Sequence, residues 1–440
     1  MRDAFEELAA HVQAALRGAE SFELNLHGEE SDFVRLNHGA VRQAGTVTQR
    51  TLGLDLAEGK RHAAGTLTLS GDLASDTARL TSLVAALREQ RAELPEDPYL
   101  VTPEAPSSGE RVLPSALPEQ GEVLDHLCAA GADRDLVGLY AAGPIHRGFA
   151  SSSGQRNWFS CASFNFDWSF YLEADRAVKA SYAGPTWRPG ELDDRIAQAA
   201  ERLELLARPP RALPPGRYAV HLAPAAVAEL LGLLGWGGFG LRALRTKTSP
   251  LLHMVDAGAT LSAAVTLAED TAGGFAPDFQ EQGFRRPERI TLIDAGVYRD
   301  CLVSPRSAVE FAAVTNGASG QEAPLSLEMA PGEVRAADAL RQLGTGIHVS
   351  NLHYLNYSDR SRCRATGMTR FACFWVENGT IVAPIGVLRF DDTLYRMLGA
   401  NLIGLTAERE TILDPQTYGG RSVESIRVPG ALIADVTFTL

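Results

Sequence analysis

Residues 49–56 read Gln-Arg-Thr-Leu-Gly-Leu-Asp-Leu, an alternation of polar and apolar side chains that is typical of a strand with one buried face. The stretches 23–27, 33–36 and 66–69 alternate in the same way. Because the chain breakers His38-Gly39 and Glu58-Gly59 lie between these stretches, we predict an antiparallel meander in this region.

Apolar residues at helical spacing flank this sheet and recur further along the chain. They predict helices over residues 1–17, 73–94, 119–131 and 191–206, and from Ala223 onward. The last third of the chain returns to strand patterns, with hairpin turns at Asp294-Ala295-Gly296 and Asn378-Gly379 and a short helix over 391–398. We therefore expect an α+β protein with a small N-terminal antiparallel sheet covered by helices and a larger β-rich C-terminal domain.

The segment 95–118 holds six prolines and shows little apolar periodicity, which is typical of an extended linker. We therefore predict an N-terminal α/β domain over residues 1–94, a linker over 95–118 and a larger β-rich domain over 119–440.

The composition limits the classes of partner. The formal net charge is −13, and phosphate backbones and anionic lipids repel such a chain unless it carries a large basic patch, which we do not find. No stretch reaches the roughly 18 apolar residues of a membrane span, and the N-terminus lacks the pattern of a secretory signal. Five scattered cysteines without CxxC spacing indicate neither a disulfide framework nor a zinc ribbon. We expect a cytoplasmic protein that binds neither nucleic acid nor membrane.

No histidine pair has the HExxH spacing that places two imidazoles and a general base on one helix face. His348 and His353 lie five residues apart in a strand-like stretch, so they are predicted to point to opposite faces and not to share a metal ion. The cysteines are predicted to be buried neutral thiols.

Several motifs, in this order along the chain, resemble the TldD/PmbA family. They are the stretch 31–43 followed by Gly53-Leu54, the stretch 344–349, and then Thr366-Gly-Met-Thr-Arg370, Val376-Glu-Asn-Gly379, Pro384 and Leu388-Arg-Phe-Asp-Asp392. The later motifs are similar to the PmbA-type, or TldE, branch. The resemblance implies a two-domain subunit related to metallopeptidases, which pairs with a TldD-like chain or with a second copy of itself and acts on unfolded peptide.

Zinc-binding members of this family carry HExxxH after a Leu-Leu pair in the helix that matches residues 223–240. Here Leu233-Leu234 is followed by Gly235 and Trp236, with Gly240 at the second histidine position. Zn²⁺ needs thiolate, imidazole or carboxylate donors, and none of these three residues supplies one. The stretch 418–429 also lacks the cysteine that the family places near its C-terminus. We expect no catalytic residue, metal or cofactor in this chain, a helix that ends near Leu234, and zinc in a TldD-like partner.

The resemblance further implies a peptide groove between subunits, where an extended peptide lies along a sheet edge. His348, Tyr354 and Asn356 are the predicted groove residues. The leading hypothesis is a zinc-free subunit that shapes the groove for proteolysis by the partner. The alternatives are a homodimeric, non-catalytic peptide-binding or scaffold protein, and autonomous hydrolysis with a thiol or a relocated metal.

Overall fold

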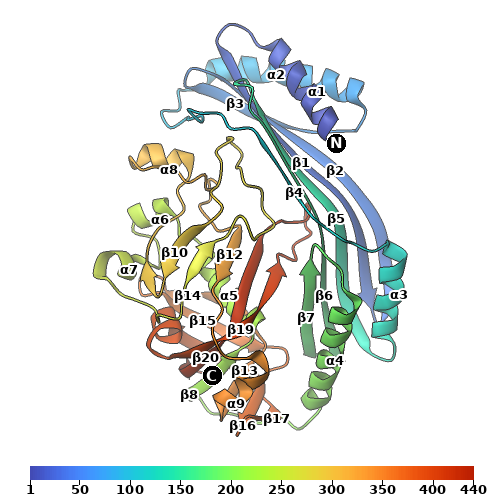
Figure 1. Ribbon diagram of the computed structural model, residues 1–440, viewed down its shortest axis with the longest axis vertical. Coiled ribbons are helices and arrows are strands. Elements are labelled where there is room, and N and C mark those ends of the chain that lie inside the picture. The colour runs from blue at the N-terminus through green and yellow to red at the C-terminus, as the bar shows by residue number, and fades with distance from the viewer.

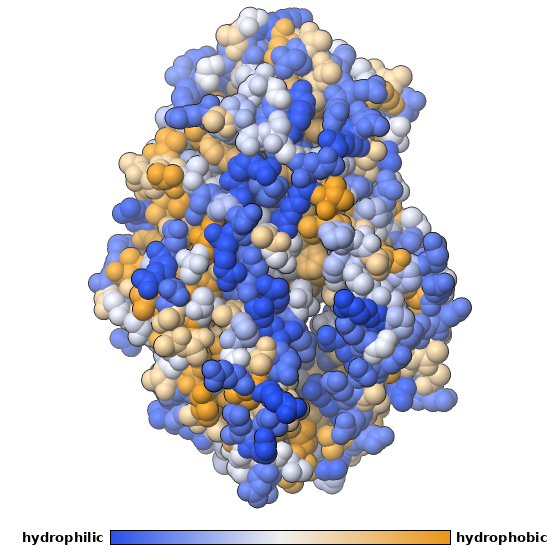
Figure 2. All heavy atoms as spheres, in the orientation of Figure 1, coloured by the Kyte–Doolittle hydropathy of each residue, from blue (hydrophilic) through white to orange (hydrophobic).

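The computed structural model describes residues 1–440 as two β-sheets that lie side by side, with helices packed on their faces and ends (Figure 1). The predicted α+β class is confirmed. The surface in Figure 2 carries many hydrophilic side chains and is hollowed near the line where the two sheets meet. No helix is both long enough and apolar enough to cross a membrane.

The first sheet has seven strands in the order β3-β2-β1-β5-β6-β4, and β7 follows β4 along the same edge of β6. All pairs are antiparallel except β4 with β6. Its strands are β1 (Glu20–Asn37), β2 (Ala40–Glu58), β3 (Arg61–Thr68), β4 (Gly109–Leu113), β5 (Asp135–Ser151), β6 (Arg156–Glu173) and β7 (Arg176–Gly184).

The meander is built from longer strands than the sequence predicts. His38-Gly39 and Gly59 have positive φ and form the expected turns. The separate strands at 23–27 and 33–36 are wrong, however, because β1 runs unbroken through Gly28, Glu29 and Glu30. Glu29 is buried, and its carboxylate accepts hydrogen bonds from the Gln49 side chain and the Arg421 backbone N–H. These partners allow a charged residue to lie inside a strand.

The predicted linker does not separate the two sheets. β4 lies within 95–118 and joins the first sheet, and β5 pairs with β1 over almost its whole length. The first sheet therefore extends to Gly184, well into the predicted second domain. The sequence missed this because pairing between distant strands leaves no local pattern. The division into separately folding domains stays a prediction.

Helices cover the first sheet at two places, as the apolar spacing predicts. Phe5, Leu8 and Val12 of α1 pack with Leu80 and Val84 of α2 on the leucines of β1 and β2. The helices α3 and α4 pack instead on the aromatic row of β6. Their bounds are α1 (Arg2–Ala15), α2 (Leu73–Glu93), α3 (Gln120–Gly131) and α4 (Pro189–Leu206).

The second sheet has thirteen strands, of which β11-β10-β9-β12-β20-β8-β13-β16-β17 form the main path. Its strands are β8 (Gly216–Leu222), β9 (Leu267–Glu269), β10 (Ile290–Asp294), β11 (Val297–Tyr298), β12 (Ser326–Met329), β13 (Gly346–Val349), β14 (Asn351–Asp359), β15 (Arg364–Arg370), β16 (Phe374–Glu377), β17 (Thr380–Pro384), β18 (Arg389–Thr393), β19 (Leu402–Leu413) and β20 (Ser425–Phe438). Asn378 and Gly379 both have positive φ, so the predicted turn between β16 and β17 is confirmed.

One apolar helix, α5 (Pro224–Gly235), lies in the core of this second half. Its leucines pack on Val220 and Leu222 of β8 and on Ala431 and Ile433 of β20. Pro224 occupies the first turn, where its missing N–H leaves no helical bond unmade. The remaining helices are short: α6 (Leu241–Arg245), α7 (Leu252–Ala257), α8 (Pro305–Glu310), the 3₁₀ helix η1 (Ala336–Asp338), α9 (Ala339–Leu343) and the π-helix η2 (Arg396–Ala400).

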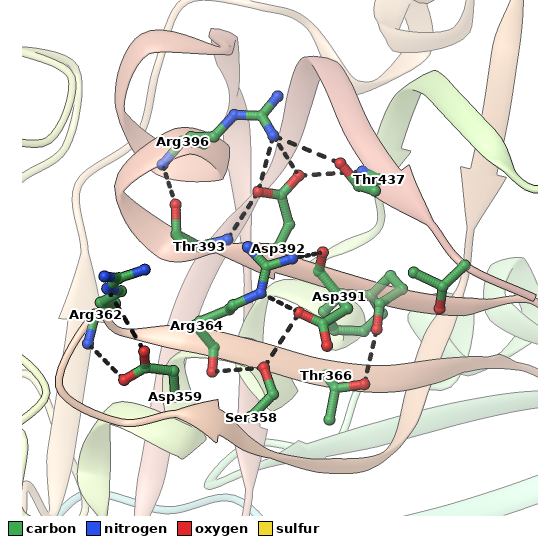
Figure 3. Close-up of polar contacts among 12 residues, drawn as sticks. Ser358, Asp359, Arg362, Arg364, Thr366, Asp391, Asp392, Thr393, Arg396 and Thr437 are labelled. Atoms are coloured by element: carbon green, nitrogen blue, oxygen red, sulfur yellow. Dashed lines mark hydrogen bonds and ion pairs between the residues drawn. The ribbon is translucent and has the colours of Figure 1, made fainter.

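The helix predicted over 391–398 is wrong at its start, because Asp391 and Asp392 belong to β18. Asp392 is fully buried, and its carboxylate accepts the backbone N–H groups of Thr393 and Thr437 and a hydrogen bond from Arg396 (Figure 3). These contacts hold β18 and the start of η2 against the C-terminal strand β20.

Candidate functional site

A cleft of about 860 Å³ lies between the two sheets. One wall comes from β6, β7 and α4, and the other comes from β19, β20, β13 and α5. In Figure 1 this region lies between β19 and β7, and Figure 2 shows hydrophilic side chains around the hollow there. Segments more than 200 residues apart in sequence, such as Asp167 and Glu408, therefore line one cavity.

Two buried histidines form part of this cleft. His221 on β8 and His348 on β13 occupy facing positions of two parallel strands, and their Nδ1 atoms lie 3.0 Å apart. Burial, and then the nearby Arg202, lowers the pKa of His221 to about 4, and burial also holds the pKa of His348 well below its usual value. Both rings are therefore neutral at pH 7, so one Nδ1 donates a hydrogen bond to the other.

Glu229 is the one charged residue of α5, and it lines the same cleft. Its carboxylate accepts the backbone N–H of Leu352, which ties α5 to the start of β14. Burial raises the pKa of Glu229 to about 7, although this hydrogen bond and Asn351 act in the opposite direction. Glu229 therefore keeps its proton to a higher pH than an ordinary carboxyl group does.

The raised pKa of Glu229 predicts a pH-dependent stability. The unfolded chain loses this proton near the ordinary value of 4.5 and the folded chain near 7, so stability falls as the pH rises between these values. Glu229→Gln keeps the acceptor oxygen and removes the charge. We expect the variant to be more stable than the original chain by about 2 kcal/mol above pH 7 and equal to it at pH 4. Urea unfolding at both pH values tests this, with the exposed Glu89→Gln as control; a pH-independent difference would contradict it.

The helix α5 ends at Gly235, close to the predicted end at Leu234. Gly237 then has a φ of +70°, and a Cβ on Gly238 would lie 2.2 Å from the carbonyl oxygen of Leu234. Only glycine fits this tight turn, in which the backbone comes close to the carbonyl oxygen of Leu234. Gly240 lies beyond the turn, where its backbone forms a β-bridge with Leu302. Gly235 and Trp236 line the cleft, whereas Gly240 does not.

Residues 215–440 match the family model of the PmbA/TldA metallopeptidase C-terminal domain. This chain belongs to the PmbA/TldD family. No curated protein sequence matches it.

Solved structures share the fold of this PmbA/TldD chain over its whole length. TldE from Thermococcus kodakarensis has a TM-score of 0.78 at 13% identity, over 99% of this chain and 100% of that one. Candidate modulators of DNA gyrase from Thermotoga maritima and Bacteroides thetaiotaomicron each have a TM-score of 0.75, at 13% and 16% identity. The first covers 100% of both chains, and the second covers 100% of this chain and 98% of that one. At these identities the likeness shows the fold alone.

The residues of this PmbA/TldD chain do not fit a zinc ion at the family's position. Gly235, Trp236 and Gly240 offer no donor, and no three His, Cys, Asp or Glu side chains in residues 1–440 are grouped to hold a metal. The backbone adds a second obstacle. Because α5 ends at Gly235, residues 235 and 240 do not lie on one helix face.

Introducing the family's zinc ligands into this chain supplies the missing donors, so it tests whether the backbone after α5 can place them around a zinc ion. We expect a triple variant with Gly235→His, Trp236→Glu and Gly240→His to bind no stoichiometric zinc, because a Cβ at residue 240 would lie 2.9 Å from the Glu322 side chain. Metal analysis of the purified variant, with its folding checked by circular dichroism, measures this. One tightly held zinc per folded chain would show that the turn does not prevent the site.

The predicted groove residues lie in different places. His348 lines the cleft, whereas Tyr354 and Asn356 are exposed on the β14–β15 hairpin and do not line it. A role for these two residues in a groove shared with another subunit stays a prediction. Sequence reasoning missed His221 and Glu229. Both could have been found from their neighbours in the sequence. The triplets Val220-His221-Leu222 and Ile347-His348-Val349 share an apolar-His-apolar pattern. Glu229 is the single charged residue in an apolar helix.

Proposed function

We propose that this chain is a zinc-free subunit of a TldD-type metallopeptidase. It contributes a wall of the peptide groove, and a TldD-like partner carries the zinc ion, the attacking water and the general base. The observation that carries this proposal is the turn after α5: the side chains at positions 235, 236 and 240 provide no zinc donor, although the first two line a large cleft. The chain itself then needs no cofactor.

The strand edges around the cleft support binding of an extended peptide. β7 pairs only with β6. β19 pairs with β20, and residues 332–334 hydrogen-bond to its other edge at Leu405–Ala407, so this edge has no strand partner from Glu408 onward. Residues of both strands line the cleft. A strand with a free edge offers unpaired backbone N–H and C=O groups, which an unfolded peptide can satisfy whatever its side chains. This mode of binding suits proteolysis of unstructured peptides.

The experiment is to express this chain and a TldD-like chain from the same genome, alone and together, and to measure cleavage of an unstructured peptide. We expect co-purification and cleavage only by the pair, with zinc held by the partner. Full activity of the TldD-like chain alone would refute the proposal. A homodimer of this chain that binds peptide without any partner would instead favour a scaffold role.

A further inference from the structure

Three basic side chains line the cleft, and only one of them has no partner within the chain. Lys179 lies 3.2 Å from Asp167, and Arg195 lies 3.5 Å from Glu410. Arg202 lines the same cleft, but its guanidinium forms neither a hydrogen bond nor an ion pair with any other group of the chain. None of its nitrogens is sealed from solvent, so its N–H donors are free to bind a ligand in the cleft.

The missing partner matters because this guanidinium lies deep in the cleft. The residue is only partly exposed, and burial lowers the pKa of Arg202, with Glu410 acting in the opposite direction. Arginine keeps its charge at neutral pH, so a cation is held here with part of its hydration removed. A partly desolvated charge without a partner costs free energy. A ligand carboxylate would offset this cost, because it can accept two parallel hydrogen bonds from the planar guanidinium.

The position of Arg202 along the cleft can be read from its neighbours. Arg195, on the same face of α4, reaches β19 at Glu410. Arg202 is two helical turns, or roughly 10 Å, further along this helix. Its charge acts on His221, where it adds to the effect of burial in lowering the pKa of that ring. Arg202 therefore lies on the side of Glu410 that is nearer to the histidine pair.

The free edge of β19 ends on this same side. Thr406 of β19 and His221 are neighbours, since a Cβ on Gly430 would lie 3.2 Å from Cγ2 of the threonine and 3.0 Å from Nε2 of the histidine. Residues 332–334 hydrogen-bond to this stretch of β19 and occupy its edge, which becomes free only from Glu408 onward. A peptide strand that pairs with β19 cannot continue past this point, so one of its ends lies beside the unpaired guanidinium.

We propose that Arg202 binds the C-terminal carboxylate of a peptide that pairs with the free edge of β19. This inference rests on the proposed function, since it names the end of the substrate that the same groove holds. An N-terminal ammonium would be repelled by the guanidinium, whereas a carboxylate makes two charge-assisted hydrogen bonds with it. With its C-terminus near Glu408 and its chain extending toward Leu413, the peptide runs antiparallel to β19.

The other charges of the cleft restrict this recognition to a single carboxylate. Acidic side chains outnumber basic ones among the residues that line the cleft. Acidic side chains elsewhere in the peptide are therefore repelled, and the chain end is the carboxylate that can reach Arg202.

The test uses the full-length chain, alone and with the TldD-like partner, and ten-residue peptides of alternating alanine and glutamine with an uncharged fluorophore at the N-terminus. One peptide ends in a free carboxylate, the second ends in an amide, and the third ends in an amide and carries an aspartate in its middle. Binding is measured by anisotropy. We expect the free acid to bind roughly tenfold more tightly than the amide, and the aspartate peptide to bind no better than the amide.

Two substitutions test whether Arg202 itself binds the carboxylate. Arg202→Gln should lower the affinity for the free acid to that for the amide and leave the affinity for the amide unchanged, which a misfolded variant would not do. Arg202→Lys keeps the charge but loses the planar fork, so it should keep part of the preference. Arg17→Gln is the matched control and should keep all of it, because Arg17 is exposed and does not line the cleft.

Equal affinities for the acid and the amide, or an unchanged preference in Arg202→Gln, would overturn the inference and leave the proposed function standing. Binding of the aspartate peptide as tightly as the free acid would overturn the assignment of the site to a chain end. No binding of any peptide, alone or with the TldD-like partner, would overturn both the inference and the proposed function.

Discussion

Replacing Asp392 with alanine is expected to destabilise the protein by about 3 kcal/mol, because the change removes a buried carboxylate and leaves its partners unpaired. Asp392 is fully buried, and Arg396 lies 3.2 Å from both of its oxygens (Figure 3). Without it, the backbone N–H of Thr437 loses its acceptor, and the guanidinium of Arg396 keeps Asp435 and a longer hydrogen bond to the Thr437 hydroxyl. The effect should appear as a lower urea midpoint for unfolding.

Asp359 provides the control for this prediction, because it is an aspartate of the same sheet in a different setting. Its carboxylate contacts Arg362 at the exposed β14–β15 turn (Figure 3). It also accepts a hydrogen bond from the Ser361 hydroxyl. Solvent replaces such contacts readily, so Asp359→Ala should change the midpoint far less. Equal shifts for the two variants would show that burial does not set the strength of the Asp392 contacts.

The contrast between these two aspartates also shows where sequence reasoning stops. Both stand in polar stretches, and the pattern around Asp391-Asp392 reads as the first turn of a helix. What makes β18 a strand is its pairing with β15 and the acceptance of the Thr437 N–H by Asp392. These contacts join residues that are far apart in sequence. The spacing of apolar residues along the sequence does not reveal such contacts. It does predict α1, α2 and α4, because the apolar face of each helix comes from residues that are close in sequence.

The sequence likewise predicts some parts of the candidate site and not others. The lack of zinc donors at positions 235, 236 and 240 can be read from the sequence, since the family motif is contiguous; that a zinc site once lay there stays a prediction. The cleft could not, because it forms between β7 and β19 and depends on how the two sheets meet. The sequence placed His348 in a groove but could not supply its partner, since the pairing of His348 with His221 follows from the register of β13 on β8.

Replacing Gly346 with alanine tests that register directly. Gly346 begins β13, and a Cβ there would lie 2.3 Å from the carbonyl oxygen of Ala219 on β8. A contact this short with a backbone atom forces the two strands apart. We expect Gly346→Ala to destabilise the protein by about 3 kcal/mol, measured by urea unfolding.

The displacement should also reach the histidine pair, because His348 lies two residues along β13 and its ring stacks on His221. Moving the strands apart would weaken the 3.0 Å Nδ1 contact and let water reach the rings, so both pKa values should rise toward their ordinary value. Histidine titration by NMR reads this out separately from stability. Gly386→Ala is the control, because a Cβ there meets no atom within 4 Å. If Gly346→Ala behaves like Gly386→Ala in both measurements, β13 does not need glycine to pack against β8, and the position of the histidine pair must depend on other contacts.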